Sequence, residues 1–336
     1  MKIAVVGAGA IGGLVGVKLA LAGEEVTFMV RGANLSAIQA KGMKLVLHDA
    51  TELVATNVKA SNDYSATGPQ DLVILAVKAN QVEALLGDLP KLFGPNTMVL
   101  TMQNGVPFWY FHKHGGHLQG TSVQSVDPTG ALMAGIPAER VIGCVVYPAS
   151  ELVEPGVVHH IEGDRFPLGE LDGSISERVT KVSEVFVKAG FKAPVLENIR
   201  SEMWLKLWGN LTFNPISSLS HATLVDICQF PLTRELASNM MLEAQSVANK
   251  LGIEFRVPLE KRIAGAEKVG KHKTSMLQDI EAGRAPEIEA LVGSVAELGR
   301  LTHTPTPHIN TVYALVKLLA KVMEDSYGCV RVIAKD

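Results

Sequence analysis

The sequence predicts an α/β fold: a doubly wound parallel sheet in an N-terminal domain, followed by an all-α C-terminal domain. Two observations predict it. Short apolar runs alternate with helical or turn segments up to about residue 197, and segments of helical periodicity dominate after Pro194. A chain of 336 residues is long enough for two domains. We place the boundary so that the domains span residues 1–198 and 199–336.

Four runs in the first half are apolar on both faces, as parallel strands covered on both sides require. They span residues 2–6, 25–30, 72–77 and 97–102. Between residues 105 and 169 the pattern is weaker, with β-like runs at 141–147 and 156–160 among scattered Gly and Pro. We expect antiparallel strands in that region.

The second half predicts helices over residues 202–213, 233–250, 275–282, 286–302 and 310–323. Gly252 suits the end of the second of these helices, and the prolines at 305 and 307 separate the last two.

Composition excludes several classes of function. The chain has 31 basic and 34 acidic residues, a formal charge of −3, so it carries no strong positive field for nucleic acid or anionic membranes. No segment has the roughly 20 uninterrupted apolar residues that cross a bilayer. The cysteines, Cys144, Cys228 and Cys329, lie far apart, which is typical of a reducing compartment. We therefore expect a cytoplasmic protein with a small-molecule substrate.

A glycine-rich run opens the first helical segment: Gly7-Ala8-Gly9-Ala10-Ile11-Gly12. Its first glycine allows a tight turn, its second lets the backbone approach a pyrophosphate, and its third permits close packing of helix and strand. Strand, helix and second strand all lie within about 30 residues, as a dinucleotide-binding unit requires. The run therefore predicts a Rossmann-type nucleotide site; a glycine-rich packing turn is the structural alternative.

The end of the second strand indicates which dinucleotide binds. Arg31 stands where an acidic residue would hold the ribose of NAD, and an arginine there suits the 2′-phosphate of NADP(H). Two further strands end in polar groups, Lys78 with Gln81 and Gln103 with Asn104. Because ligands lie outside the carboxyl ends of parallel strands, we expect Arg31, Lys78, Gln81 and Asn104 in the cofactor site.

The segment 202–215 is apolar nearly all round, apart from a stripe of Lys206, Asn210 and Asn214 four residues apart on one helix face. A desolvated lysine has a lowered pKa and becomes a proton donor nearer neutral pH. Alternatively, its stem lies on apolar surface and its head reaches water. Downstream, residues 275–278 predict a capping box at Ser275, and Pro286 with Glu287 predicts a helix start.

Together these motifs resemble the ketopantoate reductase family over both halves of the chain. They are the glycine run, Arg31, the strand end around Lys78 and Gln81, Gln103-Asn104-Gly105, the Lys206, Asn210 and Asn214-Pro215 helix, and Ser275-Met276-Leu277-Gln278-Asp279 with Glu287. The resemblance implies NADPH-dependent reduction of ketopantoate to pantoate, on the route to pantothenate and coenzyme A.

The resemblance also implies roles for individual residues. Lys206 would be the general acid, with Glu287 assisting near the reacting oxygen. Asn210, Asn214 and Ser275 would orient the substrate, while Asn104 and Lys78 would line the cofactor cleft.

The chain departs from the family pattern in two places. Residues 220–224 read Ser-His-Ala-Thr-Leu where some members supply another substrate-binding asparagine, and residues 108–111 form an aromatic cluster, Phe-Trp-Tyr-Phe. The cluster suits a core or a dimer contact, or it reshapes the substrate pocket. Reduction of a different 2-keto acid therefore stays open.

Other readings stay open as well. A 3-hydroxyacid dehydrogenase also uses a lysine and an asparagine one helical turn apart, and an NADPH-binding sensor would need no lysine stripe. His112, His114 and His117 form a cluster without an evident fourth metal ligand, so we predict no metal site. A homodimer through the helical half is a further expectation.

Overall fold

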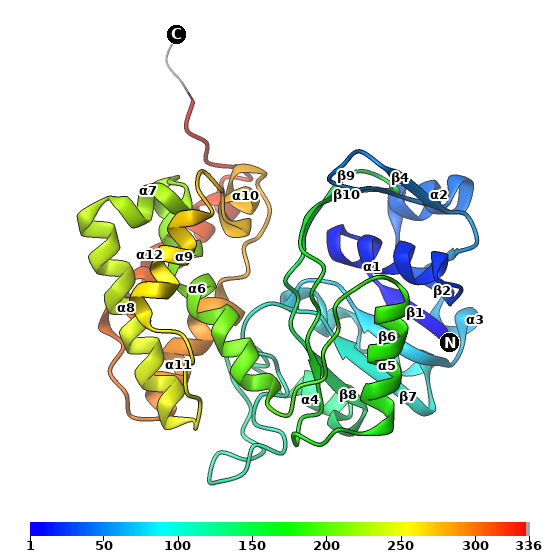
Figure 1. The fold of residues 1–336 in the computed structure, drawn as a ribbon, viewed down its shortest axis with the longest axis horizontal. Coiled ribbons are helices and arrows are strands. Elements are labelled where there is room, and N and C mark those ends of the chain that lie inside the picture. Colours follow the sequence, from blue (N-terminus) through cyan, green and yellow to red (C-terminus); the bar gives the residue numbers. More distant parts are fainter. Residues whose placement is uncertain (334–336) are drawn as a thin grey trace. The chain divides into compact units, whose positions relative to one another are not determined.

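The computed structural model describes residues 1–333, which form two compact units (Figure 1). The first unit comprises Met1–Gln103, Phe108–Ser122 and Thr129–Ile199. The second comprises the chain from Arg200 onward together with two short segments of the first half, Asn104–Pro107 and Val123–Pro128. The chain thus passes between the units several times.

The first unit is built on a seven-stranded sheet. Its strands, in spatial order, are β11 (Leu168–Gly169), β8 (Val141–Cys144), β7 (Phe93–Thr101), β6 (Gln70–Leu75), β1 (Lys2–Val6), β2 (Glu25–Met29) and β5 (Lys59–Ser61). All neighbours are parallel except β11, which runs antiparallel to β8. The strand order reverses between β1 and β6, as in a Rossmann-type doubly wound sheet, so the predicted fold class is confirmed.

A second sheet has the order β4 (Glu52–Ala55), β3 (Met43–Val46), β10 (Val157–Glu162) and β9 (Ala149–Glu154). Helix α1 (Ala10–Leu21) packs between the two sheets, and its glycines make this possible. A Cβ on Gly13 would meet the side chains of Met43 and Val158 at 2.5 and 2.6 Å, and one on Gly16 would meet Phe28 at 2.3 Å. A helix enclosed on two sides needs small residues on both.

The expectation for residues 105–169 was correct only in part. β9 and β10 pair antiparallel, but β8 pairs parallel with β7 and extends the main sheet. β10 also pairs parallel with β3, a strand that the sequence did not predict. The β-like runs in this region predict strands, but they do not indicate which strands pair with one another.

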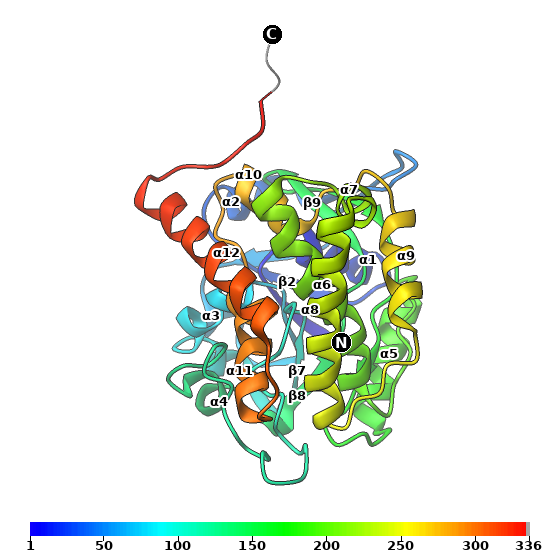
Figure 2. The same cartoon turned by 90° about the vertical axis from the view of Figure 1, so that its left-hand side faces the viewer.

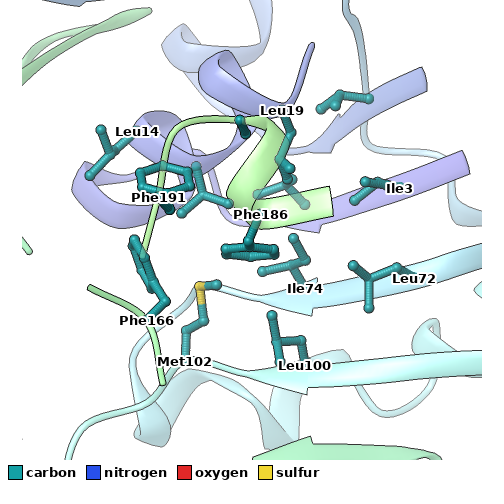
Figure 3. Close-up of a cluster of buried hydrophobic side chains, with 14 of the residues drawn as sticks. Ile3, Leu14, Leu19, Leu72, Ile74, Leu100, Met102, Phe166, Phe186 and Phe191 are labelled. Atoms are coloured by element: carbon teal, nitrogen blue, oxygen red, sulfur yellow. The ribbon is translucent and has the colours of Figure 1, made fainter. Parts of the chain in front are cut away.

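The core of the first unit lies between the main sheet and its helices (Figure 3). At one end three aromatic rings meet: Phe166, Phe186 of α5 (Glu177–Lys188) and Phe191, with centroids 4.8 to 5.8 Å apart. The remaining short elements of this unit are α2 (Gly32–Lys41), α3 (Tyr64–Thr67), η1 (Ala79–Gln81), η2 (Glu83–Leu85), η3 (Leu89–Leu92), α4 (Ala131–Gly135) and η4 (Ala138–Arg140).

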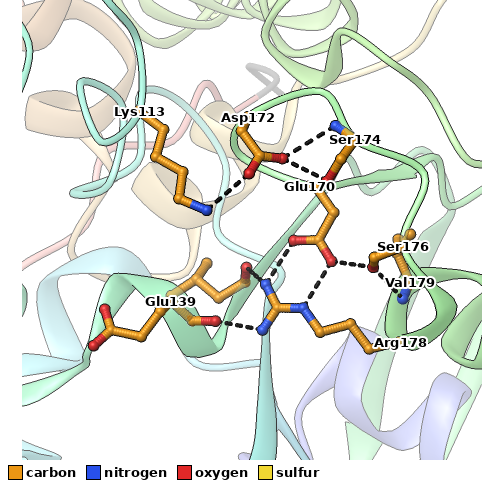
Figure 4. A network of polar contacts seen from close by, with 9 residues as sticks. Lys113, Glu139, Glu170, Asp172, Ser174, Ser176, Arg178 and Val179 are labelled. Atoms are coloured by element: carbon orange, nitrogen blue, oxygen red, sulfur yellow. Dashed lines mark hydrogen bonds and ion pairs between the residues drawn. The ribbon is translucent and has the colours of Figure 1, made fainter.

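A polar network fastens α5 to the sheet (Figure 4). The guanidinium of Arg178 donates to both carboxylate oxygens of the buried Glu170, at 2.7 and 2.6 Å, and to the backbone carbonyls of Glu139 and Val141. Ser176, the N-cap of α5, also donates to Glu170. A buried carboxylate is stable here because a bidentate cation and a hydroxyl satisfy it.

The aromatic cluster of residues 108–111 belongs to the core of the first unit. Its four side chains are at most 5% exposed, and the indole of Trp109 donates to Thr101 Oγ1 at 2.9 Å. Of the alternatives that the sequence left open for this cluster, the structure supports core packing.

The second unit is helical (Figure 2). Its elements are α6 (Ile199–Ser220), α7 (Leu224–Gln229), α8 (Pro231–Lys250), α9 (Leu259–Lys268), α10 (Ser275–Glu281), the π-helical turn η5 (Glu289–Gly293), α11 (Ser294–Leu301) and α12 (Pro307–Asp325). None of the helices in residues 1–333 is long and apolar enough to cross a membrane.

Helix α6 is the central helix of the second unit. Trp204, Trp208 and Leu211 are fully buried, and the Trp208 indole donates to the carbonyl of Met241 in α8 at 2.7 Å. The sequence predicted this helix only as far as Phe213, whereas it continues past Pro215 to Ser220. Pro215 cannot donate the usual backbone hydrogen bond, yet α6 continues through it between the buried Phe213 and Ile216.

Candidate active site

The glycine run occupies the turn between β1 and α1, and its three glycines meet three different requirements. Gly7 has a φ of +95°, and its N–H donates to Met29 at the end of β2. A Cβ on Gly12 would lie 1.9 Å from the carbonyl oxygen of Gly7, so only glycine lets helix and turn approach. A Cβ on Gly9 would meet nothing within 4 Å. The turn is therefore tight on one side and open on the other.

The N-terminus of α1 is suited to an anion. Gly9 caps it without a side-chain hydrogen bond, and the first turn contains no acidic residue. The first N–H groups of a helix have no intrahelical acceptors and carry partial positive charge, which favours a phosphate. Asn34 braces the turn from α2, because its amide donates to Ala8 and accepts from the N–H of Gly156, both at 2.7 Å. The open side of Gly9 fits the pyrophosphate of a dinucleotide.

Two predicted cofactor residues follow the ends of β2 and β6, the strands on either side of β1. Arg31 is exposed, is the N-cap residue of α2 at the end of β2, and makes no hydrogen bond or salt bridge within residues 1–333. Lys78 follows β6 and is half-buried. Gln81 has a local role, since its side chain accepts from the Lys78 N–H at 3.2 Å. Gln103 ties the β7 end to β6 by donating to Leu75 and Val77.

The second unit contains a separate polar cluster, centred on Lys206. The half-buried ammonium of Lys206 donates to Asn104 Oδ1 at 2.6 Å. These residues are 102 positions apart in the chain, and Asn104 belongs to the second unit although it directly follows the first unit's Gln103. The structure thus places Asn104 beside Lys206.

The two asparagines of the α6 stripe differ from Lys206. Asn214 is only 5% exposed and Asn210 is half-buried, and neither side chain hydrogen-bonds to a residue in the described part of the chain. An amide side chain that makes no hydrogen bond within residues 1–333 has donors and an acceptor available to a ligand. Both carboxamides are therefore suited to binding a polar substrate.

The capping box predicted at Ser275 was wrong. Thr274 is the N-cap of α10, accepting from the Leu277 N–H at 3.3 Å, and Ser275 is the exposed first residue of the helix. Gln278 donates to Lys273 rather than back to the helix start. This leaves the Ser275 hydroxyl uninvolved in capping. Glu287 is half-buried just before the π-helical turn η5.

One histidine of the cluster lies near aromatic side chains. His114 stacks against the rings of Tyr110 and Phe111, with centroids 5.7 and 5.2 Å apart. Residues 1–333 contain no group of three or more His, Cys, Asp or Glu side chains arranged to hold a metal ion.

Sequence reasoning missed three residues that organise these sites. Asn34 braces the glycine turn, Ala290 of η5 accepts from the Val106 N–H at 2.8 Å beside Asn104, and Glu297 of α11 binds the segment around Ser125. Asn34 and Glu297 are polar residues without a motif, and Ala290 acts through its backbone. No local pattern marks them.

The fold and the glycine turn define a dinucleotide-binding oxidoreductase with a helical second unit. Comparison with known proteins gives the family. Residues 3–173 match the model described as "Ketopantoate reductase PanE/ApbA", and residues 198–320 match the model of its C-terminal part. The chain belongs to the ketopantoate reductase family.

Individual relatives agree with this assignment. A 2-dehydropantoate 2-reductase of Mesorhizobium japonicum is 53% identical over 95% of this chain and 98% of its own length. The crystal structure of a candidate ketopantoate reductase from Ralstonia solanacearum MolK2 is 40% identical, with a TM-score of 0.91 over 96% of this chain and 98% of that one. D-mandelate dehydrogenase, solved with NADH and anilino(oxo)acetate, shares the fold at 23% identity, with a TM-score of 0.81 over 96% of this chain and 100% of its own.

Proposed function

We propose that this protein reduces ketopantoate (2-dehydropantoate) to pantoate with NADPH, using Lys206 as the general acid. The observation that carries the proposal is the hydrogen bond from the Lys206 ammonium to Asn104. Asn210 and Asn214, four and eight residues further along the same helix, have side-chain amides that make no hydrogen bond within residues 1–333. The 53% identical 2-dehydropantoate 2-reductase supports the choice of substrate.

The first unit would hold the nucleotide. Its pyrophosphate would lie at the N-terminus of α1 beside Gly9, and Arg31 would bind the 2′-phosphate that distinguishes NADPH from NADH. Lys78 and Asn104 would contact the cofactor further along. When bound, NADPH supplies the hydride that adds to the ketone carbon.

The second unit would supply the proton and orient the keto acid. As the C=O bond accepts the hydride, negative charge develops on its oxygen, and Lys206 would give that oxygen its Nζ proton. Glu287 would hydrogen-bond near the same oxygen. Asn210, Asn214 and Ser275 would bind the substrate's carboxylate and hydroxyl, which fixes the ketone for attack.

A second candidate is the reduction of another 2-keto acid. D-mandelate dehydrogenase has the same fold and was solved with an oxoacetate, so this fold does not determine the substrate's side chain. Residues 220–224, which depart from the family pattern, are where a different preference would arise.

The test is NADPH consumption by the purified protein with ketopantoate and, separately, with 2-ketoisovalerate, which has a hydrogen in place of the hydroxymethyl group. We expect faster turnover of ketopantoate. Lys206→Ala should lower kcat about 10² to 10⁴-fold, the usual effect of losing a general acid. Lys250→Ala, an exposed lysine at the end of α8, is the matched control and should be unchanged.

Full activity in Lys206→Ala would remove the general acid from the proposal. Preference for 2-ketoisovalerate would favour the second candidate. Tight NADPH binding without turnover of either acid would instead favour the sensor. The cytoplasmic location and the homodimer stay predictions, and light scattering of the purified protein tests the dimer.

A further inference from the structure

One helical segment, η5 followed by α11, holds both short segments that the second unit takes from the first half of the chain. The carbonyl of Ala290 accepts from the Val106 N–H at 2.8 Å. About two helical turns after Ala290, the carboxylate of Glu297 accepts from the backbone N–H groups of Gln124 and Ser125, both at 2.7 Å. The segment that carries Asn104 is therefore fixed to this helix at its backbone.

The contact beside Asn104 requires glycine. Gly105 has a φ of +85°, and a Cβ there would lie 2.1 Å from the Ala290 oxygen and 2.4 Å from its carbon. Atoms of the backbone cannot move aside as the end of a side chain can. Any other residue at 105 would push the segment away from the helix.

The π-helical turn makes the Ala290 carbonyl available. In an α-helix this carbonyl would accept from the N–H of Ser294, four residues on. Here the Ser294 N–H bonds to Glu289, five residues back, and the Ala290 oxygen accepts instead from Val106 and from the Ser294 hydroxyl, the latter at 2.8 Å. Single π-helical turns inside helices often occur at functional sites.

A second set of contacts joins the turn to α12. The carboxylate of Glu289 accepts from the Tyr313 hydroxyl at 2.8 Å and from Lys317 Nζ at 2.5 Å, both on α12. Burial and the Glu289 carboxylate raise the pKa of Tyr313 to about 12, so its hydroxyl stays a donor. The turn is thus held between α12 and the segment that carries Asn104.

We propose that Gly105 and the Ala290 carbonyl are positioning elements for the reaction: they hold Asn104 so that its Oδ1 faces Lys206 Nζ. This rests on the proposed function, in which Lys206 donates the proton. A charged donor that loses one acceptor becomes less basic, and its ammonium is held less firmly in one direction.

Gly105→Ala tests the proposal against Asn104→Ala and the double variant. We expect kcat with ketopantoate to fall about ten- to hundredfold in Gly105→Ala, as expected for one hydrogen bond to a charged group. The double variant should be no slower than Asn104→Ala alone, since both changes remove the same contact. Fully additive losses would overturn the proposal.

Gly252→Ala is the matched control. Gly252 has a φ of +77°, so an alanine there is strained in the same way, but its Cβ would meet nothing within 4 Å. It should keep the kcat of the parent protein. If Gly252→Ala loses as much kcat as Gly105→Ala, backbone strain rather than the Ala290 contact explains the loss, and the proposal is wrong.

A second readout does not depend on turnover. Acetylation of Lys206, followed by peptide mass spectrometry across a pH series, gives the midpoint at which its amine becomes reactive. Gly105→Ala and Asn104→Ala should both move this midpoint to lower pH, by about one pH unit. An unmoved midpoint in Gly105→Ala would overturn the positioning role even if turnover falls. A moved midpoint in a protein that does not reduce ketopantoate would keep the positioning role and reject the proposed function.

If Gly105→Ala does not fold, Tyr313→Phe takes its place. It removes one hydrogen bond that holds the π-helical turn, at a residue of α12 outside the proposed site. We expect the pH midpoint of Lys206 acetylation to move to lower pH, but by less than in Gly105→Ala. We expect kcat to fall a few-fold. No change in either measurement would overturn the proposal.

Discussion

The turns after β1 and β7 both contain a glycine with positive φ, Gly7 at +95° and Gly105 at +85°. The surroundings of the two turns differ. After β1 the chain leaves open space beside Gly9, which suits a ligand, whereas after β7 the Ala290 carbonyl fills the space beside Gly105. A glycine at a strand end therefore marks either a place for a ligand or a place where the chain packs onto itself. Only the surrounding atoms distinguish the two.

The largest effect that sharpens this comparison should come from Gly12→Ala. Its Cβ would overlap the Gly7 carbonyl, and overpacking of this kind costs about 3 kcal/mol or more. We expect the midpoint of thermal unfolding, measured by calorimetry, to fall by about 10 °C. NADPH binding should be lost as well, because the turn itself is displaced.

Gly9→Ala is the partner variant, and it should separate binding from stability. Its Cβ enters open space, so the thermal midpoint should stay within about 1 °C of the parent value, by the small effect usual for substitutions that touch nothing. The affinity for NADPH should fall about tenfold or more, because the methyl group occupies the approach of the pyrophosphate. Unchanged affinity would show that the open side of Gly9 is not where the nucleotide lies.

The sequence predicted the first of the two turns well and the second poorly, for a physical reason. The strand, the glycine run and the helix lie within some 20 residues, so local periodicity and glycine spacing suffice to predict the turn. The contact between Asn104 and Lys206 joins residues 102 positions apart and depends on how the chain passes between units. Residue types at strand ends indicated Asn104, but not that it contacts Lys206.

The π-helical turn and the second sheet show what a pattern cannot predict. The turn reads Glu-Ala-Leu-Val-Gly, and a glycine inside a helix does not by itself indicate a bond five residues back. β3 and β4 are only four residues each, and strands this short are hard to recognise until their partner is known.

A middle-sized effect should come from Arg31→Ala, which tests the ligand side of the comparison. Arg31 makes no salt bridge within residues 1–333, and its side chain does not cap α2, so its loss should not weaken the fold. We expect the dissociation constant for NADPH to rise about tenfold, from loss of one charge-assisted hydrogen bond, while that for NADH stays the same. Fluorescence titration with both nucleotides measures this.

Lys41→Ala, at the opposite end of the same helix, is the control for a general loss of positive charge. It should leave the ratio of the two dissociation constants unchanged. Equal weakening of NADPH and NADH by Arg31→Ala would mean that Arg31 does not contact the 2′-phosphate.

The smallest effect should come from the point where the chain returns to the first unit after residues 104–107. Lys113 donates to Asp172 at 2.8 Å (Figure 4), and this hydrogen bond, together with those from Ser174, holds the pKa of Asp172 well below its ordinary range. Both side chains are more than a third exposed, so the pair contributes at most about 1 kcal/mol. Lys113→Met should lower the thermal midpoint at pH 7 by about 3 °C or less.

The pH dependence of that difference has a definite sign. A carboxylate whose pKa is lower in the folded state stabilises the fold above its unfolded pKa of about 3.9, and this contribution disappears as pH falls toward the folded pKa. The midpoints of Lys113→Met and the parent protein should therefore converge below about pH 4. A larger loss at pH 7 would mean that charge holds the segment Phe108–Ser122 on the first unit. A small loss is expected because its aromatic side chains at 108–111 are buried and already hold it there.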